Sequence, residues 1–394
     1  MRGRRPIRVL VLHCVTRNGG DAAILYALSR QIRDAFGEDA EITAIDASPD
    51  DARSAHGHLG TFVDNPFSSF APGATIKARL VMATVLLRIA VLLTRPLASR
   101  VVGWIKPGLR PFVEADVVVA TGGTYLVEHY NLAPALFSLM LARASRRPVV
   151  YYTQSLGPSR KPHNRRVLRW CMRDAGAIFV REERSRQHLQ EIGVRQRVKV
   201  CADAAFALPP ASDAEVSATD GPRVAISLRQ WAQFGTREPE SGMSTYLRSV
   251  ASAAERLIEE HHARIEFVST CQGIPSYKFK DDEVARRCVE MIREPWRDAV
   301  EVNGSFHTPT DLLRRLLGFD FVLSTRMHMA ILSMVAERPV HAIAYEFKTV
   351  ELFSGIGLSE EVTRIESIEP PAFAERVSSS FANRQALRQR VREA

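Results

Sequence analysis

The sequence predicts an α/β protein with two Rossmann-like, doubly wound domains that face each other across a cleft. Short apolar runs alternate with segments of helical periodicity along the chain, and polar residues gather where the apolar runs end. A proline-rich stretch divides this alternation into two halves, and 394 residues is an ordinary length for two domains. In such folds the carboxyl ends of the strands meet at one edge of each sheet, where ligands bind.

The first predicted domain, residues 1–208, opens with a strand at 7–13, a glycine loop and a helix at 21–36. Apolar residues of this helix recur on one face. The loop lacks the G-x-G-x-x-G spacing of dinucleotide-binding domains, so we expect no nicotinamide cofactor. Asp21 is interpreted as the N-cap of the helix, with a catalytic role as the alternative, because the loop faces the ligand-binding edge of the sheet.

The rest of the first domain continues the same alternation. Residues 46–75 are expected to be irregular because they are rich in Ser, Pro, Gly, Asp and His. A helix is predicted at 182–192, where Gly193 ends it. Further strands are predicted at 41–45, 116–121, 149–153, 177–180 and 198–201.

A basic and apolar helical insertion, residues 76–110, interrupts the first domain. Between Asp64 and Glu114 every charged residue is Lys or Arg. The apolar run 80–93 within it has 14 residues, which is too short to span a bilayer. Two interpretations follow: a pair of core-packed helices, or a basic amphipathic helix that lies on an anionic membrane surface.

A linker is predicted at 209–222, which contains three prolines. The second domain, 223–370, repeats the alternation, with a loop expected at 271–282, and a C-terminal helix is predicted at 371–394. Its helices are predicted at 245–261, 284–292 and 311–317, and its strands at 224–228, 265–269, 299–302, 319–323 and 340–345.

Charge and cysteine content narrow the classes of partner and compartment. The net charge is +9, but no run of like charge reaches five residues, so we expect no nucleic-acid partner and favour anionic ligands or an anionic membrane surface. The five cysteines are odd in number, widely spaced and without a Cys-x-x-Cys pair, which predicts neither disulfides nor a metal site. The cysteine pattern predicts a reducing, cytoplasmic location, and the first apolar run is too short for a signal peptide.

The strand at 319–323 runs through Ser324 and Thr325 into a helix, with Arg326 and His328 at the turn. The first N–H groups of a helix are unpaired and attract anions. Arginine adds a permanent charge with a fork of donors, and histidine adds a proton that is exchangeable near neutral pH. The turn therefore suits an anionic substrate that must also be protonated.

Two further cations follow other predicted strands, Arg181 in the first domain and Lys348 in the second. Taken singly, an arginine after a strand is usually a surface ion-pair partner, and a lone histidine is commonly structural. Their shared position at strand ends, across one cleft, instead predicts a pocket for a phosphate or carboxylate.

Seven short segments with polar or glycine residues occur in order along the chain: Asn18-Gly19-Gly20-Asp21-Ala-Ala-Ile24, Thr121-Gly122-Gly123, Gln154-Ser155-Leu156-Gly157-Pro158, Val180-Arg181-Glu182-Glu183-Arg184-Ser185, Asp203 with Phe206, Ser324-Thr325-Arg326-Met327-His328 and Ala344-Tyr345-Glu346-Phe347-Lys348. Taken together, they resemble the motifs of the polysaccharide pyruvyl transferases, and the resemblance covers most of residues 7–360. One departure is Thr124, where many members have a third glycine.

The resemblance implies a glycosyltransferase-B-like pair of domains and transfer of a pyruvyl group from phosphoenolpyruvate to two hydroxyls of a sugar, which forms a ketal and releases phosphate. It implies no cofactor beyond phosphoenolpyruvate as co-substrate, and no metal. The acceptor is expected to be a saccharide, either in a polysaccharide or linked to lipid at the inner face of the membrane, where residues 76–110 would make peripheral contact.

The same resemblance assigns roles to residues. His328 is the expected general acid, Arg326 a catalytic and donor-binding residue, and Asp21 a weak candidate for the base. The remaining donor-binding residues are expected to be Arg181, Lys348, Ser324 and Thr325. The acceptor side or cleft is expected to include Asn18, Gly19, Gly20, Gly122, Gly123, Gln154 and Ser155.

Two alternative functions remain open on the sequence. The same fold serves sugar-nucleotide-dependent glycosyltransferases, and fold alone does not decide function. A catalytically inactive, membrane-associated scaffold of polysaccharide assembly would also account for the acid-free basic stretch that contains residues 76–110.

Overall fold

The computed structural model describes residues 5–70, 75–128, 130–211, 221–271 and 280–394. Contacts between residues divide the chain into two compact units. The first comprises Met1–Thr16 and Ile24–Ala204, and the second comprises Arg17–Ala23 and Ala205–Ala394. Most of the predicted linker, residues 212–220, lies outside the described residues.

The first unit is built on a parallel sheet with the strand order β3-β2-β1-β4-β6-β7-β8, and β5 pairs with β6. Residues of β1 alternate between two buried clusters, with Val9 and Val11 in one and Leu10 and Leu12 in the other. Helices therefore cover both faces of the sheet, which explains the continuous apolar run in β1. The strands are β1 (Arg8–Cys14), β2 (Glu41–Asp46), β3 (Thr61–Asp64), β4 (Val117–Ala120), β5 (Gly123–Leu126), β6 (Val149–Leu156), β7 (Ala177–Val180) and β8 (Val198–Val200).

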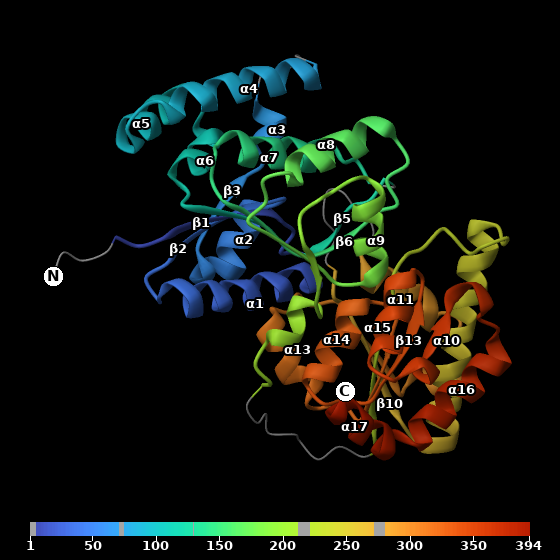
Figure 1. The fold of residues 1–394 in the computed structure, drawn as a ribbon. Coiled ribbons are helices and arrows are strands. Elements are labelled where there is room, and N and C mark those ends of the chain that lie inside the picture. The colour runs from blue at the N-terminus through green and yellow to red at the C-terminus, as the bar shows by residue number, and fades with distance from the viewer. Residues whose placement is uncertain (1–4, 71–74, 129, 212–220, 272–279) are drawn as a thin grey trace. The chain divides into compact units, whose positions relative to one another are not determined.

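Two helices of the first unit, α4 and α5, pack against each other and form an outer layer over α7 and α6 (Figure 1). Within the described residues, no helix is both long and apolar enough to cross a membrane. The helices are α1 (Gly19–Phe36), α2 (Pro49–His56), α3 (Pro66–Ser69), α4 (Ile76–Val91), α5 (Arg95–Ile105), α6 (Arg110–Glu114), α7 (Ala133–Ala144), α8 (Pro162–Met172) and α9 (Glu183–Glu191).

The second unit is built on a parallel sheet with the order β11-β10-β9-β12-β13-β14. This is the strand order of a Rossmann domain, in which the chain reverses its direction of progress between β9 and β12. The strands are β9 (Arg223–Ser227), β10 (Arg264–Val268), β11 (Val300–Asn303), β12 (Phe321–Ser324), β13 (Val340–Ala344) and β14 (Val362–Arg364). The helices are α10 (Pro239–His261), α11 (Asp281–Val289), α12 (Glu294–Arg297), α13 (Pro309–Leu316), α14 (Met327–Val335), α15 (Phe347–Gly355), α16 (Pro370–Ala382) and α17 (Arg384–Glu393).

The predicted fold class is confirmed, since both units are doubly wound parallel sheets. The expectation that residues 46–75 are irregular is wrong, because α2, β3 and α3 lie there. The strand β3 was hidden because it lies at the sheet edge and buries only Phe62, so it has no apolar run. In the predicted loop at 271–282, residues 272–279 lie outside the described residues, and α11 already begins at Asp281.

His13, near the end of β1, has the left-handed backbone conformation, with φ of 66°. Its ring lies 4.5 Å from the ring of Tyr125, centroid to centroid. The Nε2 atom is buried and has no hydrogen-bond partner among the described residues. Burial lowers the pKa of His13 to about 3, so the imidazole is neutral at physiological pH.

This buried imidazole predicts a pH-dependent loss of stability. Below its ordinary pKa of about 6.5 the unfolded chain takes up a proton at His13 and the folded protein does not, so stability falls as the pH falls. Between pH 7 and pH 5 we expect His13 to lower the free energy of unfolding by about 2 kcal/mol. The free energy of unfolding can be measured with urea at both pH values. Between pH 7 and pH 5 it should fall less in His13→Gln than in the wild type. The exposed His163→Gln should show the same decrease as the wild type. An unchanged pH dependence in His13→Gln would contradict this assignment.

Candidate active site

Cationic side chains follow three neighbouring strands of the second unit. Arg229 follows β9, Arg326 and His328 follow β12, and Lys348 follows β13. The carboxyl ends of these parallel strands meet at the same sheet edge, and β9 and β12 flank the point where the strand order reverses. Rossmann folds bind ligands at this reversal point.

The turn between β12 and α14 is fixed by buried hydrogen bonds. Ser324 and Thr325 are both 1% exposed. The Thr325 N–H donates to the Ser227 carbonyl at 2.8 Å, which extends the pairing of β12 with β9. The Thr325 hydroxyl also lies 2.7 Å from the hydroxyl of buried Tyr246 in α10. The backbone at the start of α14 is therefore rigidly placed.

Arg326 immediately precedes α14, and its guanidinium is paired with the Asp281 carboxylate. Its Nε lies 3.2 Å from each carboxylate oxygen, and Nη2 donates to Oδ1. Burial alone would lower the pKa of Arg326, but the adjacent carboxylate outweighs it, so the pKa lies above its ordinary value. Asp281 also accepts from the N–H groups of Thr270 at 3.1 Å and Cys271 at 3.0 Å.

The glycine loop Arg17–Ala23 groups with the second unit, although it comes from the start of the chain. Asn18 forms an antiparallel bridge with Cys271, and the Gly19 N–H donates to the Thr270 carbonyl at 2.8 Å. The Asn18 side chain accepts from the Gly20 N–H at 3.1 Å, so Asn18 caps α1. The prediction that Asp21 is the N-cap is therefore wrong, because α1 begins at Gly19 and Asp21 lies in its first turn.

The same loop contacts the predicted general acid. A Cβ atom built on Gly20 would lie 2.2 Å from Nδ1 and 2.4 Å from Cγ of His328. Any residue larger than glycine at this position would have to displace the imidazole or the loop. The structure thus brings Gly20 and His328 together, which the sequence pattern did not indicate.

Two further groups complete this edge of the second unit. The Lys348 ammonium lies 2.8 Å from a carboxylate oxygen of Glu346. The Arg229 guanidinium lies over the rings of Tyr345, at 4.0 Å, and Trp231, at 5.0 Å. Among the described residues, Arg229 forms no ion pair with a carboxylate. Arg229 was not among the predicted site residues. Its position directly after the strand predicted at 224–228 could have identified it.

In the first unit, Arg181 lies at the end of β7 in a buried polar network. Its side chain is 5% exposed and is paired with Asp203. Its guanidinium also donates to the hydroxyls of Ser155, at 2.7 and 2.9 Å, and Thr124, at 2.9 Å. Ser155 in turn donates to Glu182 at 3.0 Å. These bonds fix the carboxyl ends of neighbouring strands with respect to one another.

The other predicted residues of the first unit are also tightly packed. Gln154 is fully buried and donates to the Ala120 carbonyl at 3.1 Å and the Tyr125 hydroxyl at 2.8 Å. A Cβ on Gly122 would lie 2.4 Å from the Thr153 hydroxyl oxygen, and Gly123 has φ of 139°. Glycine is therefore required sterically at 122 and favoured by conformation at 123.

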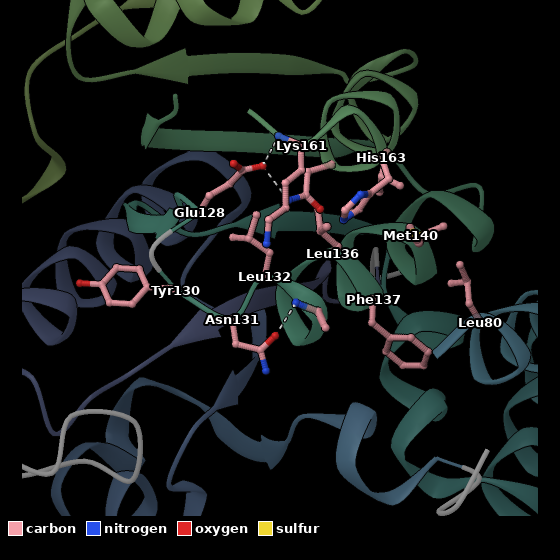
Figure 2. Close-up of a pocket in the computed structure, with 13 residues that line it drawn as sticks. Leu80, Glu128, Tyr130, Asn131, Leu132, Leu136, Phe137, Met140, Lys161 and His163 are labelled. Atoms are coloured by element: carbon pink, nitrogen blue, oxygen red, sulfur yellow. Dashed lines mark hydrogen bonds between the residues drawn. The ribbon is translucent and has the colours of Figure 1, made fainter. Parts of the chain in front are cut away.

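A pocket in the first unit was not predicted. It has a volume of about 370 Å³ and lies between α7, α8 and Leu80 of α4 (Figure 2). Figure 2 shows apolar side chains such as Phe137 and Met140 on one side, and Glu128 near the backbone of Lys161 on another. Glu128 accepts from the N–H groups of Arg160 and Lys161 at 2.8 and 2.9 Å. None of the predicted site residues lines it.

Among the described residues, no three His, Cys, Asp or Glu side chains are grouped as metal ligands. The five cysteines are all free.

Solved structures with a similar fold include the UDP-GlcNAc 2-epimerase of Methanocaldococcus jannaschii, with a TM-score of 0.58, 10% identity and coverage of 95% of this chain and 92% of that one. A glycosyltransferase of Rickettsia africae matches with a TM-score of 0.59, 10% identity and coverage of 99% and 94%. At this identity the likeness concerns the fold alone, and it confirms the glycosyltransferase-B-like fold.

Sequence relatives are more specific. The amylovoran biosynthesis protein AmsJ of Erwinia amylovora is 26% identical over 292 residues, which cover 71% of this chain and 68% of that protein. Residues 18–346 match the family described as polysaccharide pyruvyl transferase. Because this match spans most of the chain, the protein belongs to the polysaccharide pyruvyl transferase family.

Proposed function

We propose that the protein transfers a pyruvyl group from phosphoenolpyruvate to two hydroxyls of a sugar, in a polysaccharide or its lipid-linked precursor, with release of phosphate. Membership of the family supports pyruvyl transfer. The AmsJ relative is named for the biosynthesis of a polysaccharide, amylovoran, which supports a saccharide acceptor. The observation that carries the proposal is that His328 and several cations follow neighbouring strands at the carboxyl edge of the second sheet.

The proposed reaction makes the two bonds of a ketal at one carbon. The methylene carbon of phosphoenolpyruvate gains a proton and becomes a methyl group, while the first sugar hydroxyl adds to the neighbouring carbon and loses its proton. The second hydroxyl then displaces phosphate from that carbon, and its proton leaves with the phosphate. His328 is the proposed general acid for the first proton, and the base is not assigned beyond the candidate Asp21.

The donor carries a phosphate and a carboxylate, so the site must offset several negative charges. Arg326 and Lys348 each have a carboxylate beside them, which reduces the net charge that they supply. Arg229 has no such ion pair among the described residues, and its planar guanidinium lies over the rings of Tyr345 and Trp231. We therefore add Arg229 to the proposed donor-binding residues, beside Arg326, Lys348, Ser324 and Thr325 and the first N–H groups of α14.

Residues assigned from the sequence to the acceptor side divide into two groups. Gly20 lies against His328, and Asn18 and Gly19 hold the loop on Cys271 and Thr270, so we propose that the three residues position the general acid. Gly122, Gly123, Gln154 and Ser155 belong to the first unit and stay predictions for the acceptor side. Arg181 stays a predicted donor ligand, and its present bonds to Asp203, Ser155 and Thr124 support at least a positioning role.

An acceptor screen with phosphoenolpyruvate, read by mass spectrometry, tests the proposed function. The expected product carries the mass of one pyruvate ketal, and phosphate is released only when the acceptor is present. Stabilisation against heating by UDP-GlcNAc, together with no stabilisation by phosphoenolpyruvate, would instead favour a sugar-nucleotide glycosyltransferase. The proposal includes the cytoplasmic location that the cysteine content predicts.

Replacing the general acid should lower turnover strongly without unfolding the protein. We expect His328→Gln to lower kcat by a factor of about 10²–10⁴, because the proton donor is lost and the ring volume is roughly kept. The exposed His163→Gln in the first unit is the matched control and should retain full activity. Near-normal turnover of His328→Gln would remove this residue from the mechanism.

The contact between Gly20 and His328 predicts a strict steric requirement. In Gly20→Ala the new methyl group must displace the imidazole, and misplacement of a catalytic group by about 1 Å costs on the order of 100-fold in rate. Gly355→Ala is the control, because a Cβ there meets no atom within 4 Å. Phosphate release and thermal melting should be measured together. A fully active Gly20→Ala enzyme would show that the ring position in this structure is not the catalytic one.

Replacing Arg229 should weaken donor binding more than it lowers the stability of the fold. Loss of a charged hydrogen bond to an anion costs about 1.5–3 kcal/mol, so Arg229→Ala should raise the Kd for phosphoenolpyruvate roughly 10-fold to 150-fold. Calorimetric titration of the donor is the direct measurement, and the exposed Arg264→Ala is the control for net charge. The same donor Kd in Arg229→Ala and wild type would contradict the assignment.

A further inference from the structure

Exposed apolar side chains are concentrated on α4 and α5 of the first unit. Among the described residues, 14 large hydrophobic side chains are exposed, and nine of them lie between positions 81 and 105. Leu92 is 82% and Trp104 88% exposed. We call the nine the α4–α5 patch: Val81, Met82, Val85, Ile89, Leu92, Leu97, Val101, Trp104 and Ile105.

The two helices that carry most of the patch each have a buried side as well. Ala83, Leu87 and Ala90 form the inner side of α4 and belong to the buried core, as do Ala98 and Val102 of α5. The two helices contact each other and lie outside α6 and α7 (Figure 1). A helix that is apolar on both its inner and its outer side normally has both sides covered. Exposed apolar area of this kind marks an interaction surface.

The charged side chains of α4 and α5 themselves all have one sign, while Glu114 and Asp116, outside these two helices, bond Ser99 and Arg95 of α5. No acidic residue occurs between Asp64 and Glu114. Arg88 is exposed between Val85 and Leu92, one helical turn from each, and Arg100 is exposed in the same way between Leu97 and Trp104. Arginines placed among apolar side chains can keep the guanidinium in water or at lipid phosphates while their stems contact apolar groups.

We propose that the α4–α5 patch docks the protein on an anionic membrane surface, with both helices lying in the plane of the interface. The apolar side chains and Trp104 would enter the boundary between headgroups and acyl chains, and Arg88 and Arg100 would pair with anionic headgroups. The proposed contact is peripheral, and none of the described helices is long and apolar enough to cross the bilayer. This inference does not depend on the proposed reaction.

The charge pattern favours lipid over a second copy of the chain. In a symmetric dimer the same patch would meet itself, so Arg88 and Arg100 would approach other arginines. Neither copy has an acidic residue within this segment to offset that repulsion. An anionic bilayer supplies both the apolar layer and the negative charge that the patch requires.

Cosedimentation of the full-length protein with vesicles tests the proposal. We expect binding to phosphatidylcholine vesicles that contain phosphatidylglycerol, weaker binding at high salt, and little binding to phosphatidylcholine alone. The double variant Arg88→Glu/Arg100→Glu should lower the partition coefficient roughly tenfold or more, and Leu92→Ser/Trp104→Ser should do the same. Phe36→Ser, an exposed aromatic residue at the end of α1, should bind like the wild type.

A second readout locates the contact. Tryptophan emission should shift to the blue on anionic vesicles in the wild type, and Trp104→Phe should remove most of that shift. Circular dichroism of each variant shows whether it is folded. Absence of wild-type binding to anionic vesicles, or binding that the patch variants leave unchanged, would overturn the proposal. A dimer in solution that Trp104→Ser dissociates would also overturn it, because a second copy would then cover the patch.

Discussion

The candidate site depends on one carboxylate, that of Asp281. It pairs with Arg326 at the start of α14 and accepts hydrogen bonds from the backbone of Thr270 and Cys271. That backbone in turn bonds the glycine loop, whose Gly20 lies against His328. Removing one member of a buried ion pair typically costs about 3–5 kcal/mol, because the other charge is left uncompensated. Here the loss would also loosen the segment that fixes the imidazole.

Both units use the same device, a cation after a parallel strand that is neutralised by a carboxylate from another part of the unit. Arg181 with Asp203 is the example in the first unit, and Arg326 with Asp281 is the example in the second. Such pairs position side chains without leaving a large net charge on the empty protein. Arg229 differs, since its described contacts are aromatic rings and a backbone carbonyl. An anion could therefore pair with Arg229 without first displacing a carboxylate, unlike at Arg181 or Arg326.

The sequence was sufficient for the features that local pattern determines. The strand before Ser324 and the helix after Arg326 follow from buried apolar runs and helical periodicity, and both are present. Long-range contacts were not accessible. Asp281 meets an arginine 45 residues away, and it lies at the end of a segment with no periodicity. The glycine loop looked like part of the first domain because a strand, a loop and a helix specify only their own connection, not the unit that the loop contacts.

Because Arg17–Ala23 belongs to the second unit, the chain cannot be divided or recombined freely at the connection between its two halves. The two halves of the chain are not independent modules, since a fragment that begins at Ala205 would lack Gly20 and the strand-like partner of Cys271. A chimera joined near the proline-rich connection would combine the glycine loop of one parent with the histidine of another. Recombination between relatives at that point must therefore preserve a match between two segments more than 300 residues apart, Gly20 and His328.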